Sequence, residues 1–244
     1  MKKKQFVFIC GCGHTGTTIT AKILKGHSMI YAQTIETGIL LANRDYKRSK
    51  MISDIHKELV RQNKALYIEK TPRHIWHIDY ARRIIKNTKF ILCIRNPRDT
   101  IASLTKRYED LGSGWRRYID ESALTIRQID LDDVYLHDYD KFVKNPINEI
   151  SKLCGFLGID YEPEMINVER REDKWFDVKE NNPNSRIDLD SGHSKRRSWQ
   201  VNQPIFDGSN QWEKILSEDE KRRLDGLLNT EESQWIASRL GYKV

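Results

Sequence analysis

The chain has 244 residues, of which 38% are hydrophobic and 32% charged, and its six Trp, ten Tyr and seven Phe supply enough bulk for the core of one sizeable domain. No apolar run approaches the roughly 20 residues of a membrane-spanning helix, which excludes an integral membrane protein. The net charge of +7 suits an anionic partner such as a phosphorylated or sulfated small molecule. Nucleic acid is disfavoured because the basic residues form several separate clusters.

The cysteines and the N-terminus point to a cytoplasmic location. Four scattered cysteines without zinc-ligand spacing predict buried, reduced thiols. The apolar run Phe6–Cys10 after the basic Met1–Lys4 is too short for a secretory signal. We therefore interpret it as a first β-strand with a charged start.

The hydrophobic pattern alternates strands and helices in chain order. Strands are expected at Phe6–Cys10, Ala65–Ile68, Phe90–Ile94 and Val134–Leu136, and helices at Thr17–Lys25, Met51–Lys64, Ile75–Lys86, Thr100–Arg107, Trp115–Ile129, Pro146–Leu157, Ser217–Leu228 and Thr230–Leu240. Strands separated by helices need crossover connections, so the pattern predicts an α/β fold with a central parallel sheet flanked by helices. Ligands of such sheets bind at the carboxyl ends of the strands.

We expect residues 1–244 to form a single domain. Its segment Glu169–Arg197 is polar and lacks apolar periodicity, and it holds Trp175, Phe176 and a basic run as possible ligand contacts. We interpret residues 169–197 as a mobile lid that orders over bound ligand. The alternative is an ordinary long surface loop.

The segment Gly11-Cys12-Gly13-His14-Thr15-Gly16-Thr17-Thr18 lies between the first strand and the first helix. Glycines let the backbone present its N–H groups, and a helix N-terminus adds positive potential, so this turn predicts phosphate binding. The spacing matches a P-loop, but Thr17 stands where the P-loop has lysine. An ordinary nucleotide-hydrolysing site would need that lysine.

A second candidate site follows the strand Phe90–Ile94. Arg95 comes at its carboxyl end, where a P-loop nucleotide hydrolase would hold magnesium with aspartate, and Ser103 lies in the next helix. An arginine and a hydroxyl converging there could bind a second phosphate. The alternative is a structural ion pair of Arg95 with Asp99.

In this order, the two motifs resemble the sulfotransferase family that uses 3′-phosphoadenosine 5′-phosphosulfate (PAPS), in its bacterial and tyrosylprotein-type branch. The resemblance covers nearly the whole chain. It extends through the further blocks Glu69-Lys70-Thr71-Pro72-Arg73, Tyr139-Asp140-Lys141-Phe142, Phe156–Ile159, Ser198–Ile205 and Trp212-Glu213-Lys214. It implies a P-loop-like three-layer fold and transfer of a sulfuryl group from PAPS to a hydroxyl or amine, without a metal, leaving 3′,5′-ADP. The acceptor stays open among small molecules, sugars and peptides.

The resemblance also assigns roles. Lys70 would neutralise the leaving group, Glu36 would act as the base and His14 would contact the sulfuryl group. The residues implied in cofactor binding are Gly13, His14, Thr15, Gly16, Thr17 and Thr18 for the 5′-phosphosulfate, Arg95 and Ser103 for the 3′-phosphate, Tyr139 near the adenine and Ser198 in the C-terminal loop. Two positions depart from the family: His14 replaces a lysine or arginine, and Asn202 replaces an arginine.

Several alternatives remain at this point. Lys70 could form a structural ion pair with Glu69 or Asp99, and Glu36 could start a helix at Gly38–Leu41. His74 and His77 lack a third metal ligand, so no metal site is expected. Trp115 and Trp199 could stack on a nucleobase, although Trp more often packs in a core. The alternative functions are a divergent nucleotide kinase and a nucleotide-binding protein without catalysis.

Overall fold

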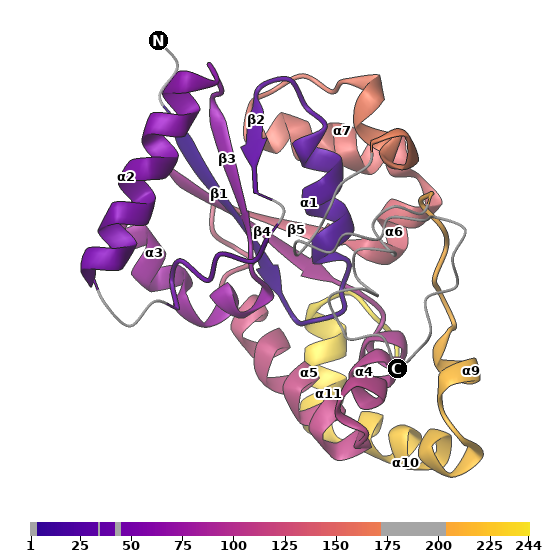
Figure 1. Cartoon of the computed structure of the whole chain (residues 1–244). Helices are drawn as coiled ribbons and strands as arrows, with labels where there is room; N and C mark the ends of the chain where they lie inside the picture. Colours follow the sequence, from indigo (N-terminus) through magenta and orange to yellow (C-terminus); the bar gives the residue numbers. More distant parts are fainter. Residues whose placement is uncertain (1–3, 34, 42–44, 172–203) are drawn as a thin grey trace.

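The computed structural model describes residues 4–33, 35–41, 45–171 and 204–244. A parallel five-stranded sheet with the order β2-β3-β1-β4-β5 forms its centre (Figure 1). The strands are β1 (Gln5–Gly11), β2 (Ile30–Ala32), β3 (Leu66–Lys70), β4 (Thr88–Ile94) and β5 (Val134–Asp138). The predicted α/β class with a central parallel sheet is confirmed.

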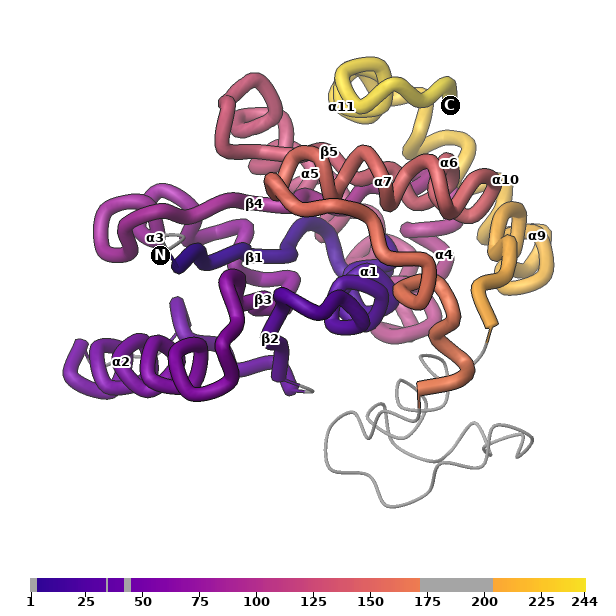
Figure 2. The backbone as a smooth tube through the Cα atoms, turned by 90° about the horizontal axis from the view of Figure 1, so that it is seen from above, coloured from indigo at the N-terminus to yellow at the C-terminus, as the bar shows by residue number. Residues whose placement is uncertain are grey.

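Helices cover both faces of the sheet. One face carries α1 (Thr17–Lys25), α6 (Tyr139–Lys144) and α7 (Pro146–Leu157), and the other carries α2 (Asp45–Arg61), the 3-10 helix η1 (Pro72–His77) and α3 (Ile78–Ile84). Figure 2 shows α1 and α3 on opposite sides of the strands. Strand β1 is buried on both faces, because Val7 and Ile9 pack toward α1 while Phe6 and Phe8 pack toward α3.

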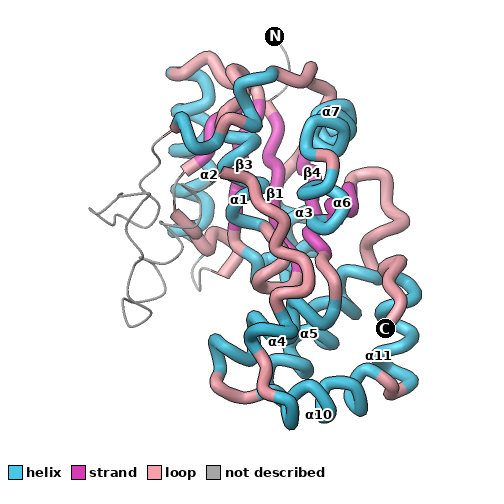
Figure 3. The backbone as a smooth tube through the Cα atoms, turned by 90° about the vertical axis from the view of Figure 1, so that its right-hand side faces the viewer, coloured by secondary structure: helices cyan, strands magenta, loops and turns pink. Residues whose placement is uncertain are grey.

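A third group of helices lies beyond the carboxyl ends of the strands (Figures 1 and 3). It comprises α4 (Pro97–Tyr108), α5 (Leu111–Ile126), α9 (Trp212–Ile215), α10 (Glu218–Leu228) and α11 (Glu231–Arg239), which share an apolar core. Two further 3-10 helices, η2 (Pro163–Ile166) and η3 (Val168–Arg170), follow α7. The described part of the chain contains no helix long and apolar enough to cross a membrane.

Capping residues account for the helix ends that the sequence predicts well. Helix α1 has the expected bounds, α7 ends before Gly158 at φ 73°, and Ser217 and Glu220 form the expected capping box of α10.

Other elements differ from the expectation. Strand β2 was missed because three residues are too short to show alternation. Helix α2 begins at Asp45 rather than Met51, and the helix expected at Ile75–Lys86 is instead η1 followed by α3. Pro72 starts the helical turn early, because its fixed φ suits a first helical position.

The register of the sheet aligns the candidate residues at one edge. Ile9 pairs with Lys70, Gly11 with Cys93, and Ile94 with Asp138. Lys70, the Gly-rich turn after β1, Arg95 after β4 and Tyr139 after β5 therefore all emerge at the carboxyl edge.

Candidate active site

The turn between β1 and α1 depends on two glycines that allow close packing. A Cβ on Gly11 would lie 2.6 Å from the Cys93 carbonyl oxygen, and φ there is +128°. A Cβ on Gly16 would lie 2.4 Å from Cδ2 of Tyr139, and φ there is +89°. Only glycine fits both positions without strain, so the chain can turn tightly between β4 and the Tyr139 ring.

The N-terminus of α1 has the features of an anion site. Gly16 is its N-cap, and no side chain of the described residues caps this end. The Thr15 hydroxyl instead donates to the Cys12 carbonyl at 2.6 Å. The first-turn N–H groups at Thr17 and Thr18 thus remain available to an anion, with the helix dipole in favour.

Gly13 behaves differently from the rest of the turn. Its N–H donates to the Glu121 carboxylate at 3.0 Å, and Glu121 also accepts from Arg117 Nε at 3.0 Å. In this structure the Gly13 amide is therefore occupied by the protein's own carboxylate. Sequence reasoning missed both Glu121 and Arg117, although their i, i+4 spacing on a helix with buried neighbours is the signal that could have found them.

His14 joins the two predicted phosphate motifs. It adopts a left-handed backbone conformation with φ 70°, and its Nδ1 lies 2.8 Å from Oγ of Ser103 on α4. Arg95 Nη1 donates to the His14 carbonyl at 3.5 Å. The structure thus brings His14, Arg95 and Ser103 together.

Arg95 is held on several sides. Its guanidinium lies 5.0 Å from the Tyr139 ring centre, and Nη2 donates to the Gly208 carbonyl at 2.5 Å. The alternative pair with Asp99 is present but long, at 3.9 Å, because that carboxylate accepts from the backbone N–H groups of Asn210 and Trp212. Arg95 Nε is buried without a hydrogen-bond partner among the described residues, so one donor of this guanidinium is left for a ligand.

Lys70 and Glu36 form an ion pair. Lys70 Nζ lies 2.6 Å from Glu36 Oε1, and the lysine side chain is only 2% exposed. The Glu69 carboxylate instead accepts from the hydroxyls of Tyr67 and Thr71. Glu36 does not begin a helix, since Gly38 has φ 59° and residues 39–41 form a turn. Two residues that were predicted separately, 34 positions apart, are therefore direct partners.

The loop that carries Glu36 is anchored to the segment after β3. Thr71 Oγ1 accepts from Gly38 N–H at 3.3 Å, and His74 Nε2 accepts from Leu40 N–H at 3.3 Å. Burial lowers the pKa of His74 to about 3, so its ring is neutral and accepts this bond near neutral pH. Burial raises the pKa of Glu69, the hydrogen-bond partner of Thr71.

The other predicted residues have varied outcomes. Tyr139 is 9% exposed and packs on Gly16 and Arg95, which leaves its role near an adenine a prediction. Trp115 donates to Ser233 Oγ at 3.0 Å and packs in the core with α11. Among the described residues no three His, Cys, Asp or Glu side chains are placed to share a metal ion.

Some predicted contacts fall outside the described residues. These are Ser198, Trp199 and Asn202, and residues 172–197 of the expected lid. The beginning of the lid segment is described, and Arg171 there donates to the Met165 carbonyl at 2.7 Å.

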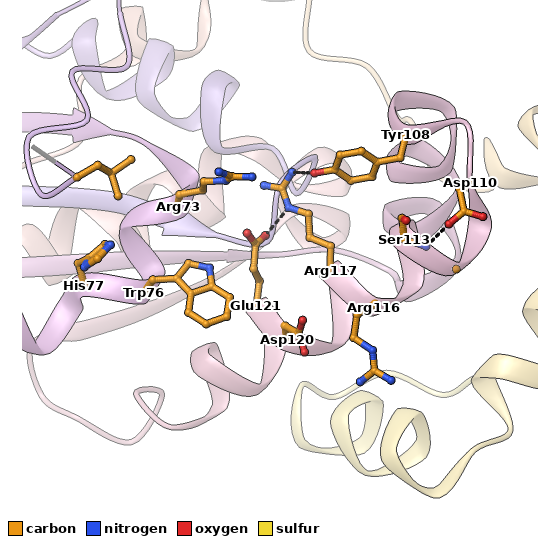
Figure 4. A pocket seen from close by; sticks show the side chains of 12 residues that line it. Arg73, Trp76, His77, Tyr108, Asp110, Ser113, Arg116, Arg117, Asp120 and Glu121 are labelled. Carbon is orange, nitrogen blue, oxygen red and sulfur yellow. Dashed lines mark hydrogen bonds and ion pairs between the residues drawn. The ribbon is translucent and has the colours of Figure 1, made fainter. Parts of the chain in front are cut away.

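An open cavity of about 990 Å³ lies between η1 and α5 (Figure 4), and it is linked to the Gly-rich turn through Glu121, which accepts from Gly13 N–H. One wall comes from η1 with Arg73, Trp76 and His77, and the other comes from the end of α4 and from α5. Glu121 and Arg117 line it from α5, and Glu121 accepts the Gly13 N–H. This volume suits a small-molecule site.

Comparisons with known proteins identify the family of the chain. A family model described as the sulfotransferase family matches residues 42–163, half of the chain. No curated protein sequence matches.

Solved structures share the fold at low identity. A sulfotransferase domain of the Synechococcus PCC 7002 olefin synthase has a TM-score of 0.64 at 17% identity, with 100% of this chain and 97% of that chain covered. A sulfotransferase domain from the curacin biosynthetic pathway has a TM-score of 0.62 at 17% identity over the full length of both chains. A mouse sulfotransferase complexed with PAP has a TM-score of 0.58 at 16% identity, with 96% and 88% covered.

Proposed function

The chain belongs to the sulfotransferase family, and on this basis we propose that it transfers a sulfuryl group from PAPS to a hydroxyl or amine, releasing 3′,5′-ADP. The observation that carries the proposal is the convergence of His14, Arg95 and Ser103 beside the uncapped start of α1. The Lys70–Glu36 pair emerges at the same edge of the sheet.

The residues present fit PAPS. The N–H groups at the start of α1, from Thr15 to Thr18, would hold the 5′-phosphosulfate. Arg95 and Ser103 would hold the 3′-phosphate, and the buried Arg95 Nε without a partner among the described residues supports this role. Tyr139 would border the nucleoside, and Ser198 is proposed as a further contact. The mouse sulfotransferase of the same fold is described as a complex with PAP, which supports the choice of cofactor.

Three side chains have separate roles in the proposed transfer. PAPS supplies the activated sulfuryl group. Glu36 would take the proton of the acceptor hydroxyl or amine, whose oxygen or nitrogen receives the sulfuryl group from PAPS. Lys70 would supply positive charge to the phosphate oxygen of the leaving 3′,5′-ADP, and His14 would contact the sulfuryl oxygens. These groups provide the charge stabilisation without a divalent metal.

The site favours this function over the two alternatives. A nucleotide kinase needs the P-loop lysine and a magnesium-binding carboxylate, but Thr17 and Arg95 occupy the corresponding positions. A non-catalytic nucleotide-binding protein gives no reason to bury a lysine against Glu36. We place the protein in the cytoplasm, because its four cysteines are free and buried.

Calorimetric titration with 3′,5′-ADP and 5′-AMP, in EDTA, tests the cofactor assignment. We expect a clear preference for 3′,5′-ADP, which Arg95→Ala reduces about tenfold or more because a charge-assisted contact to the 3′-phosphate is lost. The matched control is Arg98→Ala, since Arg98 instead pairs with Asp225 and lies over the Trp212 ring.

Three outcomes would overturn the proposal. If Arg95→Ala weakened the binding of 3′,5′-ADP and of 5′-AMP equally, Arg95 would not bind the 3′-phosphate. Tight binding of ATP–magnesium with no preference for 3′,5′-ADP would support the kinase. If the protein bound 3′,5′-ADP but transferred no sulfuryl group from PAPS to any of a panel of hydroxyl and amine compounds, it would be a nucleotide-binding protein without catalysis.

A further inference from the structure

The cavity between η1 and α5 holds three arginines in different states. Arg117 is paired with Glu121 at 3.0 Å and donates to the Tyr108 hydroxyl. Arg116 pairs with Glu232 at 3.6 Å and lies over the Trp115 ring. Arg73 is exposed, and no hydrogen bond or ion pair of its side chain is found within the described residues.

The orientation of the Arg73 side chain, which has no hydrogen-bond or ion-pair partner within the described residues, indicates where a ligand would bind. In Figure 4 its guanidinium points into the cavity, toward that of Arg117. Two cations that face each other repel, and of Arg73 and Arg117 only Arg117 has a carboxylate partner within the described residues. An anionic group between them would relieve the repulsion and receive charge-assisted hydrogen bonds from Arg73.

The acidic residues of the cavity do not fill this role. Asp110 caps α5 by accepting from Ser113 N–H at 2.6 Å. Glu121 is engaged by Gly13 and Arg117. Asp120 lies beside Arg116 in Figure 4, away from Arg73. The positive charge of Arg73 is therefore left for a ligand.

Trp76 gives the same wall an apolar surface. Its side chain is 53% exposed and lines the cavity. An exposed indole at a cavity wall offers a flat face on which a ring can stack. It lies on η1, directly after Lys70 and Thr71, so the catalytic lysine and the cavity wall belong to one short segment.

We propose that this cavity binds the acceptor, and that the acceptor is a small hydroxylated or aminated carboxylic acid. Its carboxylate binds Arg73, its ring or apolar face lies on Trp76, and its hydroxyl or amine reaches toward Glu36 and the Gly-rich turn. This inference rests on the proposed sulfuryl transfer and adds the chemical class of the substrate. The volume of the cavity, about 990 Å³, fits a small molecule.

Matched acid and neutral acceptors test the proposal. The probes are 4-hydroxyphenylacetate with its amide, and methyl glucuronide with methyl glucoside. Binding to the enzyme saturated with 3′,5′-ADP is measured by calorimetry, and transfer from PAPS is measured as kcat/KM. We expect at least one acid to exceed its neutral partner by about tenfold or more in both readouts, as one charge-assisted contact provides.

Variants attribute that preference to the cavity. In Arg73→Gln, the affinity and the kcat/KM of the acid should each fall to within about threefold of those of its neutral partner. The affinity for the neutral compound and for 3′,5′-ADP should stay as in the wild type. Trp76→Ala should weaken both members of the pair and keep their ratio. The matched control is Arg127→Gln, an exposed arginine after α5 that lies outside the cavity, and it should change nothing.

The outcomes separate this proposal from the proposed function. If the wild-type protein did not bind 3′,5′-ADP, the proposed sulfotransferase site itself would be refuted. With that binding intact, the acidic-acceptor proposal is overturned if the neutral partners perform as well, if no acid binds, or if Arg73→Gln weakens both members equally.

Discussion

Lys70 is a buried cation whose environment explains its position. Its side chain is 2% exposed, and a lone ammonium at such a place would lose most of its hydration. The carboxylate of Glu36, 28% exposed, compensates this cost at 2.6 Å. Removing one partner of such a pair leaves an uncompensated charge, so the two residues act as a unit.

Replacing Lys70 should affect transfer more than binding. We expect Lys70→Ala to lower kcat by about a hundredfold or more, the scale found when one group that stabilises developing charge is removed. Affinity for 3′,5′-ADP should stay within a few-fold. Steady-state kinetics and calorimetry on the same preparation measure both quantities.

Two further variants complete the Lys70 experiment. Lys70→Arg should recover part of the rate because it keeps the charge, and Lys86→Ala, an exposed lysine after α3, should leave both quantities unchanged. A parallel collapse of affinity and rate in Lys70→Ala would instead make Lys70 a ground-state ligand of the cofactor.

At the scale of elements, the end of β3 organises the loop that carries Glu36. Lys70 pairs with Glu36, the Thr71 hydroxyl oxygen accepts from Gly38 N–H, and the His74 ring accepts from Leu40 N–H. Residues 36–41 of the loop are thus held at three points by residues 70–74, which follow from the end of β3 into η1. We infer that Thr71 positions Glu36 without touching the substrate.

The Thr71 hydroxyl should matter for the rate as well as for stability. Thr71→Val removes the acceptor of Gly38 N–H and leaves the buried Glu69 with one donor fewer, which costs about 1–3 kcal/mol of unfolding free energy. We expect kcat to fall by about tenfold or more, with 3′,5′-ADP affinity retained, because the loop no longer holds Glu36 in place. Urea denaturation and steady-state kinetics measure the two effects.

The matched control is Thr105→Val, a buried threonine whose hydroxyl donates to the Ile101 carbonyl of its own helix. This variant should leave kcat intact, and Thr71→Ser should restore most of the lost rate. A kcat equal to wild type in a folded Thr71→Val protein would show that the loop does not depend on this bond.

At the scale of the whole molecule, the sequence predicted what local patterns encode. The bounds of α1 and α7 follow from helical spacing and capping glycines, and the residues at the carboxyl ends of β3 and β4 were expected there. The contact between Gly13 and Glu121 joins residues 108 positions apart, and no local pattern encodes such a distance. The short β2 was likewise set by its pairing with β3 rather than by its own three residues.

Burial also gives the protein a predictable response to acid. Burial lowers the pKa of His137 from 6.5 to about 4 and that of His74 to about 3. Neither nitrogen of His137 has a hydrogen-bond partner among the described residues, and its ring lies 5.4 Å from that of Phe142. Protonation below pH 6.5 is therefore easier in the unfolded chain, which withdraws stability as the pH falls.

The unfolding free energy should decline as the pH falls from 6.5 toward 4, by up to about 1.4 kcal/mol per pH unit for each such histidine. His137→Phe removes one titrating group and keeps a ring of similar shape. We expect this variant to lose about 1.5 kcal/mol less than wild type between pH 6.5 and pH 5, measured by urea denaturation at each pH. An identical slope in His137→Phe and wild type would show that His137 does not contribute to the acid response.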